Sequence, residues 1–532
     1  MVLYDDTWLW LVILGFIIAF VLAFGLGAND VANAFGTSVG AKVLTIRQAC
    51  ILGTIFEILG AILVGAKVSN TIRKGIISPE LYTNGTEDVF MAGNVAALTG
   101  SCIWLMVATL FGLPVSGTHS IVGATLGFSM VVNGVKGIGW VKLAMIAASW
   151  FISPLMSGIV SSLLFKFIDI LILSKEKPLE YGLRLLPIFY AFTLAVNLFS
   201  VFYKGSELLH FNKIPLYGTL ILTFGPALIV ALLVKIFLVP RQRTKIQKQC
   251  KKLLEEEDHV ATTIPVTTIE EAGNQEITTH FFDKDKNRRE NVKHITEGDD
   301  SKLKRSLLGV NAEQKSTLDE KVPLSSETET TDVDIEIAEE GDTNAEKKDQ
   351  SMARDNVKDK PETAGLFSFL QILTAVFGSF AHGGNDVSNA VGPLVALWVT
   401  ATTGSAAQKV PVPIWVLVYG GVGISFGLWI LGRRVMKTMG EDLTKITPSS
   451  GFCIEVGSAL TVIVASSIGI PISTTHCKVG SVVCVGRVRS RESVDWRLFR
   501  NIILAWCVTL PVSGGLSALA MLGYRAILNA LR

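Results

Sequence analysis

The chain has 532 residues, of which 49% are hydrophobic and 18% are charged, and its formal net charge is +2. Soluble proteins contain about 25% charged residues. The deficit here is uneven, because residues 241–364 hold 50 of the 94 charged residues. The rest is too poor in charge to solvate a globular surface, which excludes a single soluble domain. No basic patch with interleaved aromatic residues occurs, so we expect no nucleic-acid binding. We predict two regions in the lipid bilayer, joined by a water-soluble insert.

Eight apolar runs approach the roughly 20 residues that a helix needs to cross a membrane. Two further apolar stretches, 91–133 and 452–486, are interrupted at Pro114-Val-Ser-Gly-Thr-His119 and at Pro471-Ile-Ser-Thr-Thr-His476. A proline with small hydroxyl residues ends a helix and exposes backbone groups, which a membrane tolerates only inside protein or beside water. We therefore predict two re-entrant helical hairpins with buried tips. The eight predicted crossings are residues 8–26, 46–66, 141–168, 184–202, 216–239, 366–381, 413–432 and 498–523.

The distribution of basic residues predicts the orientation, because Lys and Arg favour the cytoplasmic side. Six of them follow the crossing that ends near residue 239, which places the insert in the cytoplasm. The sequon at Asn84 makes this residue a glycosylation candidate, and it falls in the 67–90 loop. If that loop lies outside, the crossings are consistent throughout, and both termini are predicted to lie outside.

Two motifs occur twice and in the same order. GANDVANAFG at 27–36 matches GGNDVSNAVG at 383–392, at an offset of 356, and LPVSGTHSIVG at 113–123 matches IPISTTHCKVG at 470–480, at an offset of 357. Such agreement indicates duplication. The first copy is predicted to start outside and the second inside, so the halves form inverted repeats, as in secondary transporters with a site at the repeat interface. The predicted fold is an all-α polytopic membrane protein with discontinuous helices.

The predicted organisation has four parts. Residues 1–168 form the first repeat, 184–239 two linking helices, and 365–532 the second repeat. Residues 240–364 are predicted to be a disordered cytoplasmic loop, because few apolar side chains are present to bury.

The first motif places carboxylates and amides in apolar, glycine-rich stretches. A carboxylate inside a membrane is costly unless it is paired or coordinated, which makes it a functional candidate. A cluster of carboxylate and amide oxygens suits a hard cation such as sodium. The alternative is that the two aspartates only cap broken helices. The predicted sodium-binding residues are Asn29, Asp30, Asn33, Asn385, Asp386 and Asn389.

The second motif forms the two hairpin tips, where the second arm of each hairpin begins. A helix N-terminus offers unpaired N–H groups and the positive end of the helix dipole. Together with neighbouring hydroxyls, it forms a cradle for a phosphate-like oxyanion. The alternative is simple helix capping, which is compatible with binding. The predicted phosphate-binding residues are Ser116, Gly117, Thr118, Ser473, Thr474 and Thr475.

Three further titratable residues, Glu57, His382 and Glu455, are candidates for ion coupling or proton sensing. They break the repeat symmetry, since Ile424 lies opposite Glu57 and Leu26 lies opposite His382 in the aligned halves. For the two glutamates, the alternative is a buried partnership with a nearby Arg or Lys.

His119 and His476 are predicted to be structural, satisfied by local hydrogen bonds, rather than ligands or proton carriers. An intramembrane hydrolase that uses Ser116 or Ser473 with the adjacent histidine is a remote alternative. The Ser-to-His spacing recurs in both halves, which favours symmetric binding over one catalytic nucleophile, and no nucleophile elbow is present. We therefore predict that the protein is not an enzyme.

The motifs GANDVANA, GGNDVSNA, PVSGTH and PISTTH resemble the duplicated signature of the inorganic phosphate transporter family, and the long charged insert is similar to its eukaryotic type III sodium-dependent branch. The resemblance implies symport of phosphate, chiefly as the monovalent anion, with two sodium ions at the plasma membrane. It implies an inverted-repeat fold with two hairpins. It places Asp30, Asp386, Ser116, Ser473, Glu57, His382 and Glu455 at positions that the family uses.

Other transport functions stay open at this point. Coupling to protons, or transport of sulfate, would use the same fold, whereas buried acids and paired hairpins argue against an open channel. The expected partners are phosphate, transported sodium and the lipid bilayer, with no other cofactor or metal. A homodimer and regulatory partners of the cytoplasmic loop are further alternatives.

Overall fold

The computed structural model describes residues 4–30, 32–83, 85–203, 210–263, 358–437, 443–468, 470, 472–490 and 494–531. Within these residues the regular structure is helical, apart from one isolated bridge between Ile77 and Ile138. Ten helices in this part of the chain are long and apolar enough to cross a membrane. Helices satisfy their own backbone polar groups, which hydrocarbon requires. The prediction of an all-α polytopic membrane protein is confirmed.

The helices follow the predicted order. The first half contains α1 (Leu9–Asn29), α2 (Ala32–Gly40), α3 (Ile46–Gly75), α4 (Glu87–Leu110), α5 (Gly117–Asn133) and α6 (Trp140–Ile168). Next come α7 (Pro178–Phe202), α8 (Leu216–Leu233) and α9 (Val239–Thr263). The second half contains α12 (Pro361–Thr403), α13 (Ile414–Lys437), α14 (Pro448–Ile468), α15 (Thr474–Arg489) and α16 (Trp496–Leu531). Two π-helical turns, η3 (Asp169–Leu173) and η5 (Val234–Leu238), extend α6 and connect α8 to α9.

The two interrupted stretches form helical hairpins, α4–α5 and α14–α15, as the sequence predicted. The second arm of each begins after a capping serine: Ser116 accepts from the backbone N–H of His119 at 3.2 Å, and Ser473 accepts from that of His476 at 3.1 Å. This is the N-cap arrangement that serine favours. The capping alternative is therefore present at both tips, where each serine satisfies one N–H group of the first turn.

Helix packing is reciprocal between the halves. Helix α3 packs along α12 and α13 along α1, while hairpin α4–α5 packs on α16 and hairpin α14–α15 on α6. The closest crossings repeat too. A Cβ on Gly27 would lie 1.8 Å from the carbonyl oxygen of Ile424, and a Cβ on Gly383 would lie 2.2 Å from that of Glu57. Glycine is therefore required where the paired helices touch backbone to backbone.

The two copies of the first motif differ in backbone. Helix α1 ends at Asn29, Asp30 is its C-cap residue, and α2 starts at Ala32, so the first copy is discontinuous as predicted. Helix α12 instead runs unbroken for 43 residues through Asp386, beyond the predicted end at residue 381. Asp386 is not an N-cap, so the capping alternative is wrong for this residue, whereas for Asp30, which borders residues outside the described part, it stays open. The physical reason is that Asp386 is embedded among continuous intrahelical hydrogen bonds.

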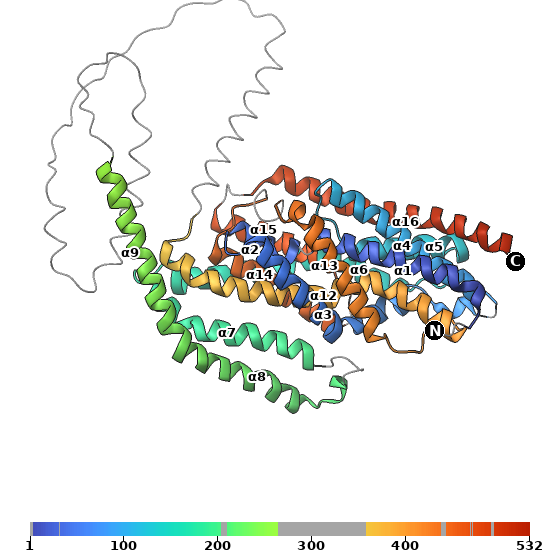
Figure 1. The fold of residues 1–532 in the computed structure, drawn as a ribbon, viewed down its shortest axis with the longest axis horizontal. Coiled ribbons are helices and arrows are strands. Elements are labelled where there is room, and N and C mark those ends of the chain that lie inside the picture. Colours follow the sequence, from blue (N-terminus) through green and yellow to red (C-terminus); the bar gives the residue numbers. More distant parts are fainter. Residues whose placement is uncertain are drawn as a thin grey trace, which may run out of the picture.

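Helix α9 differs from the prediction that residues 240–364 are disordered. It follows directly after α8 and η5. Its residues Ile246 and Cys250 are buried, and Ile246 packs beside Gly365 of α12, which holds α9 against the bundle. Residues 264–357 lie outside the described part. Figure 1 shows both termini at one end of the bundle and α9 at the other. We name these the termini end and the α9 end.

Candidate functional site

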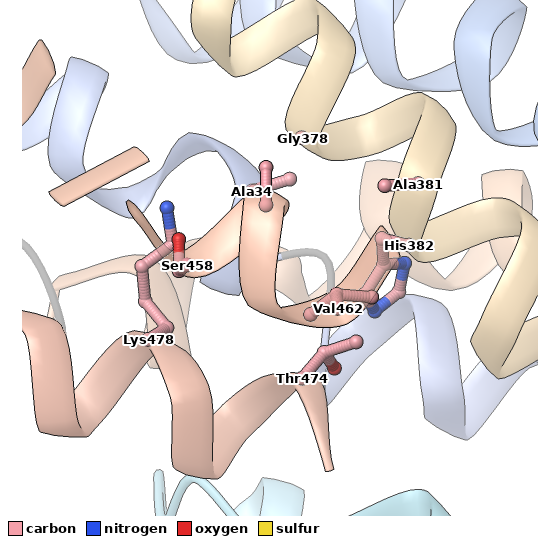
Figure 2. A pocket seen from close by; sticks show the side chains of 9 residues that line it. Ala34, Gly378, Ala381, His382, Ser458, Val462, Thr474 and Lys478 are labelled. Atoms are coloured by element: carbon pink, nitrogen blue, oxygen red, sulfur yellow. The ribbon is translucent and has the colours of Figure 1, made fainter. Parts of the chain in front are cut away.

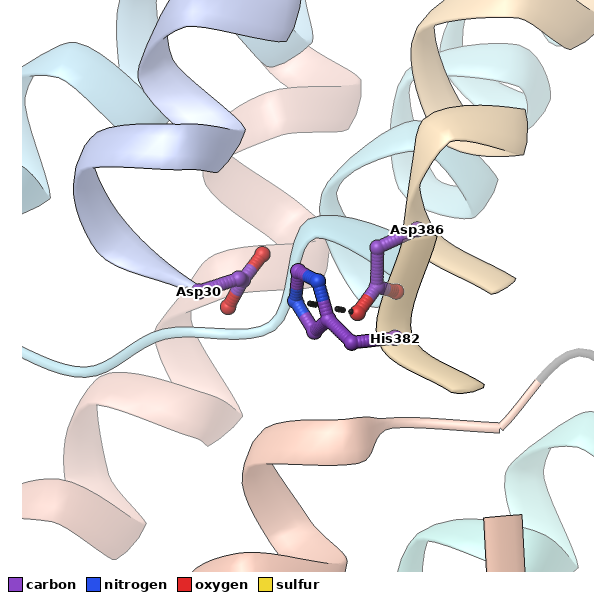
Figure 3. Close-up of side chains that lie close together, drawn as sticks. All are labelled: Asp30, His382 and Asp386. Carbon is purple, nitrogen blue, oxygen red and sulfur yellow. Dashed lines mark ion pairs between the residues drawn. The ribbon is translucent and has the colours of Figure 1, made fainter. Parts of the chain in front are cut away.

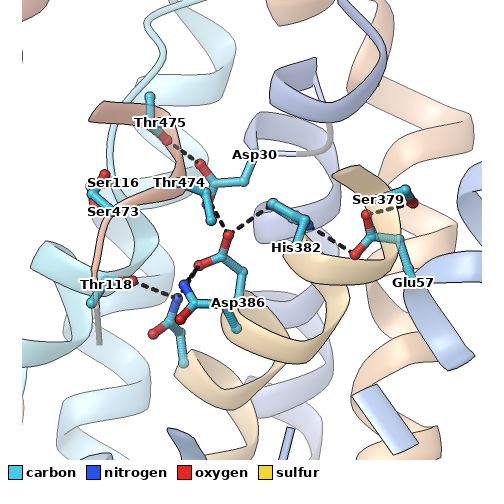
Figure 4. A network of polar contacts seen from close by, with 12 residues as sticks. Asp30, Glu57, Ser116, Thr118, Ser379, His382, Asp386, Ser473, Thr474 and Thr475 are labelled. Atoms are coloured by element: carbon cyan, nitrogen blue, oxygen red, sulfur yellow. Dashed lines mark hydrogen bonds and ion pairs between the residues drawn. The ribbon is translucent and has the colours of Figure 1, made fainter. Parts of the chain in front are cut away.

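The two hairpin tips meet in the middle of the bundle. Thr118 of the first tip donates to the carbonyl oxygen of Ile472 at 3.2 Å, and Thr475 of the second donates to that of Val115 at 3.2 Å. These two bonds are repeat-equivalent, because Thr118 matches Thr475 and Val115 matches Ile472. The predicted phosphate residues of both halves are therefore adjacent in space, and Figure 4 shows the polar contacts around them.

Both predicted aspartates line this junction, and each is 1% exposed. Thr475 donates to Oδ1 of Asp30 at 2.9 Å, and Thr474 donates to Oδ2 of Asp386 at 2.6 Å. Asp30 belongs to the first half and Asp386 to the second, yet both contact the second tip. The first motif of each half and the second tip thus form one polar centre.

The amides of Asn385 and Asn389 are oriented by Asp386. Their Nδ2 groups donate to Oδ1 of Asp386 at 3.0 and 3.1 Å. The Oδ1 atoms of Asn385 and Asn389 are therefore buried with no hydrogen-bond partner. An orphaned buried acceptor costs about 1–3 kcal/mol. Two such oxygens beside a carboxylate are the kind of ligands that a hard cation takes.

Asn29 is repeat-equivalent to Asn385, but both polar atoms of its side chain form hydrogen bonds. Its Nδ2 donates to Thr109 and to the carbonyl oxygen of Leu113, at 3.1 and 2.9 Å, and its Oδ1 accepts from the N–H of Val115 at 3.1 Å. Asn29 therefore holds the first tip in place, and its sodium role stays a prediction. The side chain of Asn33, and the whole of Asn84, lie outside the described residues.

A group of three ligands lies at the boundary of the halves. Asp30, His382 and Asp386 each offer an atom within 4.8 Å of the others, and all three are buried (Figure 3). Two carboxylates this close in a medium of low dielectric repel each other unless positive charge lies between them. A cation, the imidazolium of His382, or both together satisfy that requirement.

His382 bridges Asp386 to Glu57. Its Nε2 lies 2.8 Å from Asp386 Oδ2 and its Nδ1 lies 2.8 Å from Glu57 Oε2. Ser379 adds a hydrogen bond to Glu57 Oε1 at 2.9 Å. The sequence predicted a possible Arg or Lys partner for Glu57, and the structure places a histidine there instead. Helices α3 and α12 bring this chain of polar groups together.

Glu455 lies in a second polar cluster. Thr37 and Ser38 of α2 donate to its Oε1 at 2.5 and 2.7 Å, and Thr374 of α12 donates to its Oε2. Lys478 of α15 is the cation whose charge acts on this carboxylate. Three hydroxyls, rather than a lysine or an arginine, are therefore the direct partners of Glu455, and among the described residues no ion pair within 4 Å joins it to Lys478.

The two tips differ for a steric reason. A Cβ on Gly117 would lie 2.2 Å from a methyl carbon of Leu26, so a hydroxyl side chain at this tip would require Leu26 to move. Thr474 occupies the equivalent place in the second tip, and there His382 replaces Leu26. The two halves therefore differ at one contact: the first half pairs a glycine with a leucine, where the second half has a threonine and a histidine.

His119 and His476 meet between the hairpins, with ring centroids 4.3 Å apart. His119 also packs on Trp150, and His476 on Trp506, at centroid distances of 4.3 and 3.6 Å. This ring packing agrees with the predicted structural role, which stays a prediction. Among the described residues no hydrogen bond joins either serine to a histidine ring, and each serine oxygen accepts from the histidine's backbone N–H.

A pocket borders the site, and Figure 2 shows side chains that line it. Its walls include His382, Thr474 and Lys478, with Ala34 of α2 and Ser458 of α14. Its free volume is about 20 Å³, room for about one water molecule. Gly378 and Ala381 also line it, and they precede Asp386 on α12, towards the α9 end.

Several residues of the site were missed by the sequence reasoning. Lys478 had a usable signal, because a lysine in an apolar stretch beside the second motif is costly in a membrane. The hydroxyl residues had none, since serine and threonine are common in membrane helices. The missed residues are Thr37, Ser38, Thr374, Ser379 and Lys478.

Known proteins share the sequence and the fold. A model of the phosphate transporter family matches residues 26–517. Sodium-dependent phosphate transporter 1-A of Danio rerio is 45% identical, over 96% of this chain and 94% of that protein, and sodium-dependent phosphate transporter 1 of Mus musculus is 43% identical, over 99% and 96%. A solved structure of a sodium-dependent phosphate transporter has a TM-score of 0.70 and 29% identity, covering 97% of this chain and 99% of that one. The chain belongs to the phosphate transporter family, as its duplicated motifs predicted.

Proposed function

We propose that this protein is a sodium-coupled symporter that imports inorganic phosphate across the plasma membrane by alternating access. The observation that carries the proposal is the meeting of two hairpin tips between two buried aspartates of a duplicated motif. The relatives named as sodium-dependent phosphate transporters support both the coupling ion and the anion. The family consists of transporters, which agrees with the prediction that the chain is not an enzyme.

Sodium is proposed to bind at the aspartates. Asp386, with the orphaned Oδ1 atoms of Asn385 and Asn389, supplies three hard oxygens within one turn and a half of α12. Asp30 provides a carboxylate from the other half, within the same ligand group. Asn29 and Asn33 are retained as proposed contributors on the first motif, by their repeat equivalence.

Phosphate is proposed to bind at the tips. Ser116, Gly117 and Thr118 begin α5, while Ser473 immediately precedes Thr474 and Thr475 at the start of α15. Each helix start directs N–H groups and a positive dipole end towards an anion. The threonine hydroxyls now bond carbonyls and carboxylates of the site, and an oxyanion would compete with these as acceptor.

Charge explains why the two substrates are coupled. An anion that approaches the tips meets the carboxylates of Asp30 and Asp386, which repel it strongly at low dielectric. Sodium at the aspartates removes that repulsion, so phosphate binds after or together with the cations. Glu57, His382 and Glu455 are proposed to tune this balance, because their buried contacts link the aspartate of α12 to α3 and connect α2, α12 and α14.

The proposed topology has inverted repeats, at residues 1–168 and 365–532, around linking helices at 184–239. The reciprocal packing of the halves supports a two-fold relation between them. The location of both termini opposite α9 supports termini outside and an insert in the cytoplasm (Figure 1). The halves are proposed to move against each other around the shared tips.

The test is uptake of radiolabelled phosphate by the full chain in liposomes, with an inward sodium gradient or with choline in place of sodium. We expect concentrative uptake with sodium and background uptake with choline. Excess unlabelled phosphate should compete, and excess sulfate should not. Equal uptake in choline under an inward proton gradient would show proton coupling instead, and competition by sulfate would change the anion.

A further inference from the structure

Lys478 is a buried cation that the proposed sodium and phosphate sites do not use. It lies on α15 one turn after Thr474 and is 4% exposed. It lines the same pocket as Thr474 and His382 (Figure 2). Its repeat equivalent is Ile121, which is fully buried. The positive charge is therefore present on one side of the tips only.

The ammonium group of Lys478 has no direct ion-pair or hydrogen-bond partner among the described residues. Among the described residues it forms no ion pair within 4 Å and no hydrogen bond, and Glu455 is the acidic group that acts on it through space. Both oxygens of Glu455 already accept hydroxyl hydrogen bonds, from Thr37, Ser38 and Thr374. A lysine whose side chain is buried inside a membrane protein and whose head group lines a pocket without an ion-pair partner is costly unless an ion pathway or a substrate uses it.

We propose that Lys478 forms a transit subsite for the phosphate anion, between the hairpin tips and the α9 end of the bundle. The inference rests on the proposed function. The ammonium donates to an oxyanion that has left Thr474, and Glu455 keeps the lysine aimed at the pocket when the anion is absent. The pocket now has room for about one water molecule. The subsite therefore works only after α15 and α12 move apart.

The residues at the repeat-equivalent positions predict that Lys478 affects phosphate affinity differently on the two sides of the protein. On the termini side, Ile121 replaces Lys478 and Leu98 replaces Glu455, so this side offers no equivalent charge. An anion that enters from the α9 end meets the lysine before the tips, whereas one from the termini end reaches the tips first. Removing the charge should therefore weaken apparent phosphate affinity on the α9 side more than on the other side.

The experiment measures KM for phosphate on each side of the full chain, reconstituted in liposomes with known orientation and saturating sodium. For Lys478→Met we expect KM at the α9 side to rise roughly tenfold or more, the size expected for one lost charge-assisted hydrogen bond. KM at the termini side should change by less than about twofold. Lys478→Arg should keep both values near wild type, because the charge is retained.

The matched control is Lys166→Met, which removes a lysine with a 63% exposed side chain at the end of α6. If Lys478→Met is not recovered in membranes, Lys478→Gln tests the same charge while keeping a polar side chain. Equal KM changes on both sides, unchanged KM values, or failure of Lys478→Arg together with Lys478→Met would overturn the subsite. Wild-type protein without sodium-driven uptake would instead refute the proposed function.

Discussion

The two halves of the bundle share their packing but differ in polarity. Backbone crossings recur in pairs, and the tip hydrogen bonds of Thr118 and Thr475 are equivalent. On the α9 side, however, polar residues stand where the other half has apolar ones. The pairs are Glu57 and Ile424, His382 and Leu26, Glu455 and Leu98, Thr374 and Ile18, and Lys478 and Ile121.

This difference separates two properties of the duplicated halves: the packing that they share, and the polar groups that distinguish the two ends of the bundle. The shared backbone contacts are what an alternating-access movement needs, because two similar arrangements of the halves must both pack well. The unshared polar groups make the two ends unequal. Buried polar groups need hydrogen-bond partners or water. The α9 side is therefore suited to admit water when it opens, and the termini side is suited to close through contacts between apolar side chains.

The largest effect is expected where the halves agree. Asp30→Asn and Asp386→Asn should each lower sodium-driven phosphate uptake at least about a hundredfold, because each removes a charge that the cations require in a buried site. The measurement is radiolabelled uptake, normalised to protein at the cell surface. Asp169→Asn, a change at a half-buried carboxylate just after α6 and outside the proposed site, is the control. If either aspartate variant kept half of the uptake, the two-aspartate site would be wrong.

A smaller effect should appear at an unequal pair. Glu57→Gln should lower uptake roughly tenfold to a hundredfold, because it removes the carboxylate beside His382 Nδ1. Ile424→Val, at the equivalent position, should change uptake by less than about twofold. In a double-mutant cycle with His382→Gln, the two losses should be less than additive by about 1 kcal/mol or more. Fully additive losses would mean that the pair does not act as a unit.

The smallest effect concerns one hydroxyl. Thr374→Val removes the donor to Oε2 of Glu455 and should lower uptake roughly threefold to tenfold, the net effect of one ordinary hydrogen bond, because Thr37 and Ser38 still donate to Oε1. Ile18→Val is its repeat-equivalent control and should be almost silent. The same assay serves for both variants. An equal loss in the two variants would point to packing and would remove the polarity difference from the explanation.

Much of the fold was predictable from local features. Apolar runs of sufficient length predicted the crossings, and Pro114 and Pro471 marked the hairpins, because a proline followed by a run of small hydroxyl residues favours the start of a new helix. The end predicted for the crossing before Asp386 was wrong. Glycines beside that aspartate suggested a break, yet Gly383 and Gly384 serve close helix contacts within an unbroken α12.

The sequence by itself determined the membrane class, the duplication and the identity of the aspartates and hairpin tips, because each depends on composition or on a short repeated motif. Only the tertiary structure decided the partners. Glu57 and His382 are 325 residues apart, and Thr37 and Glu455 are 418 apart. No local pattern predicts such pairs, since they depend on how α2, α3, α12 and α14 pack. The hydroxyl residues gave no signal in the sequence, and only that packing shows which buried charge they face.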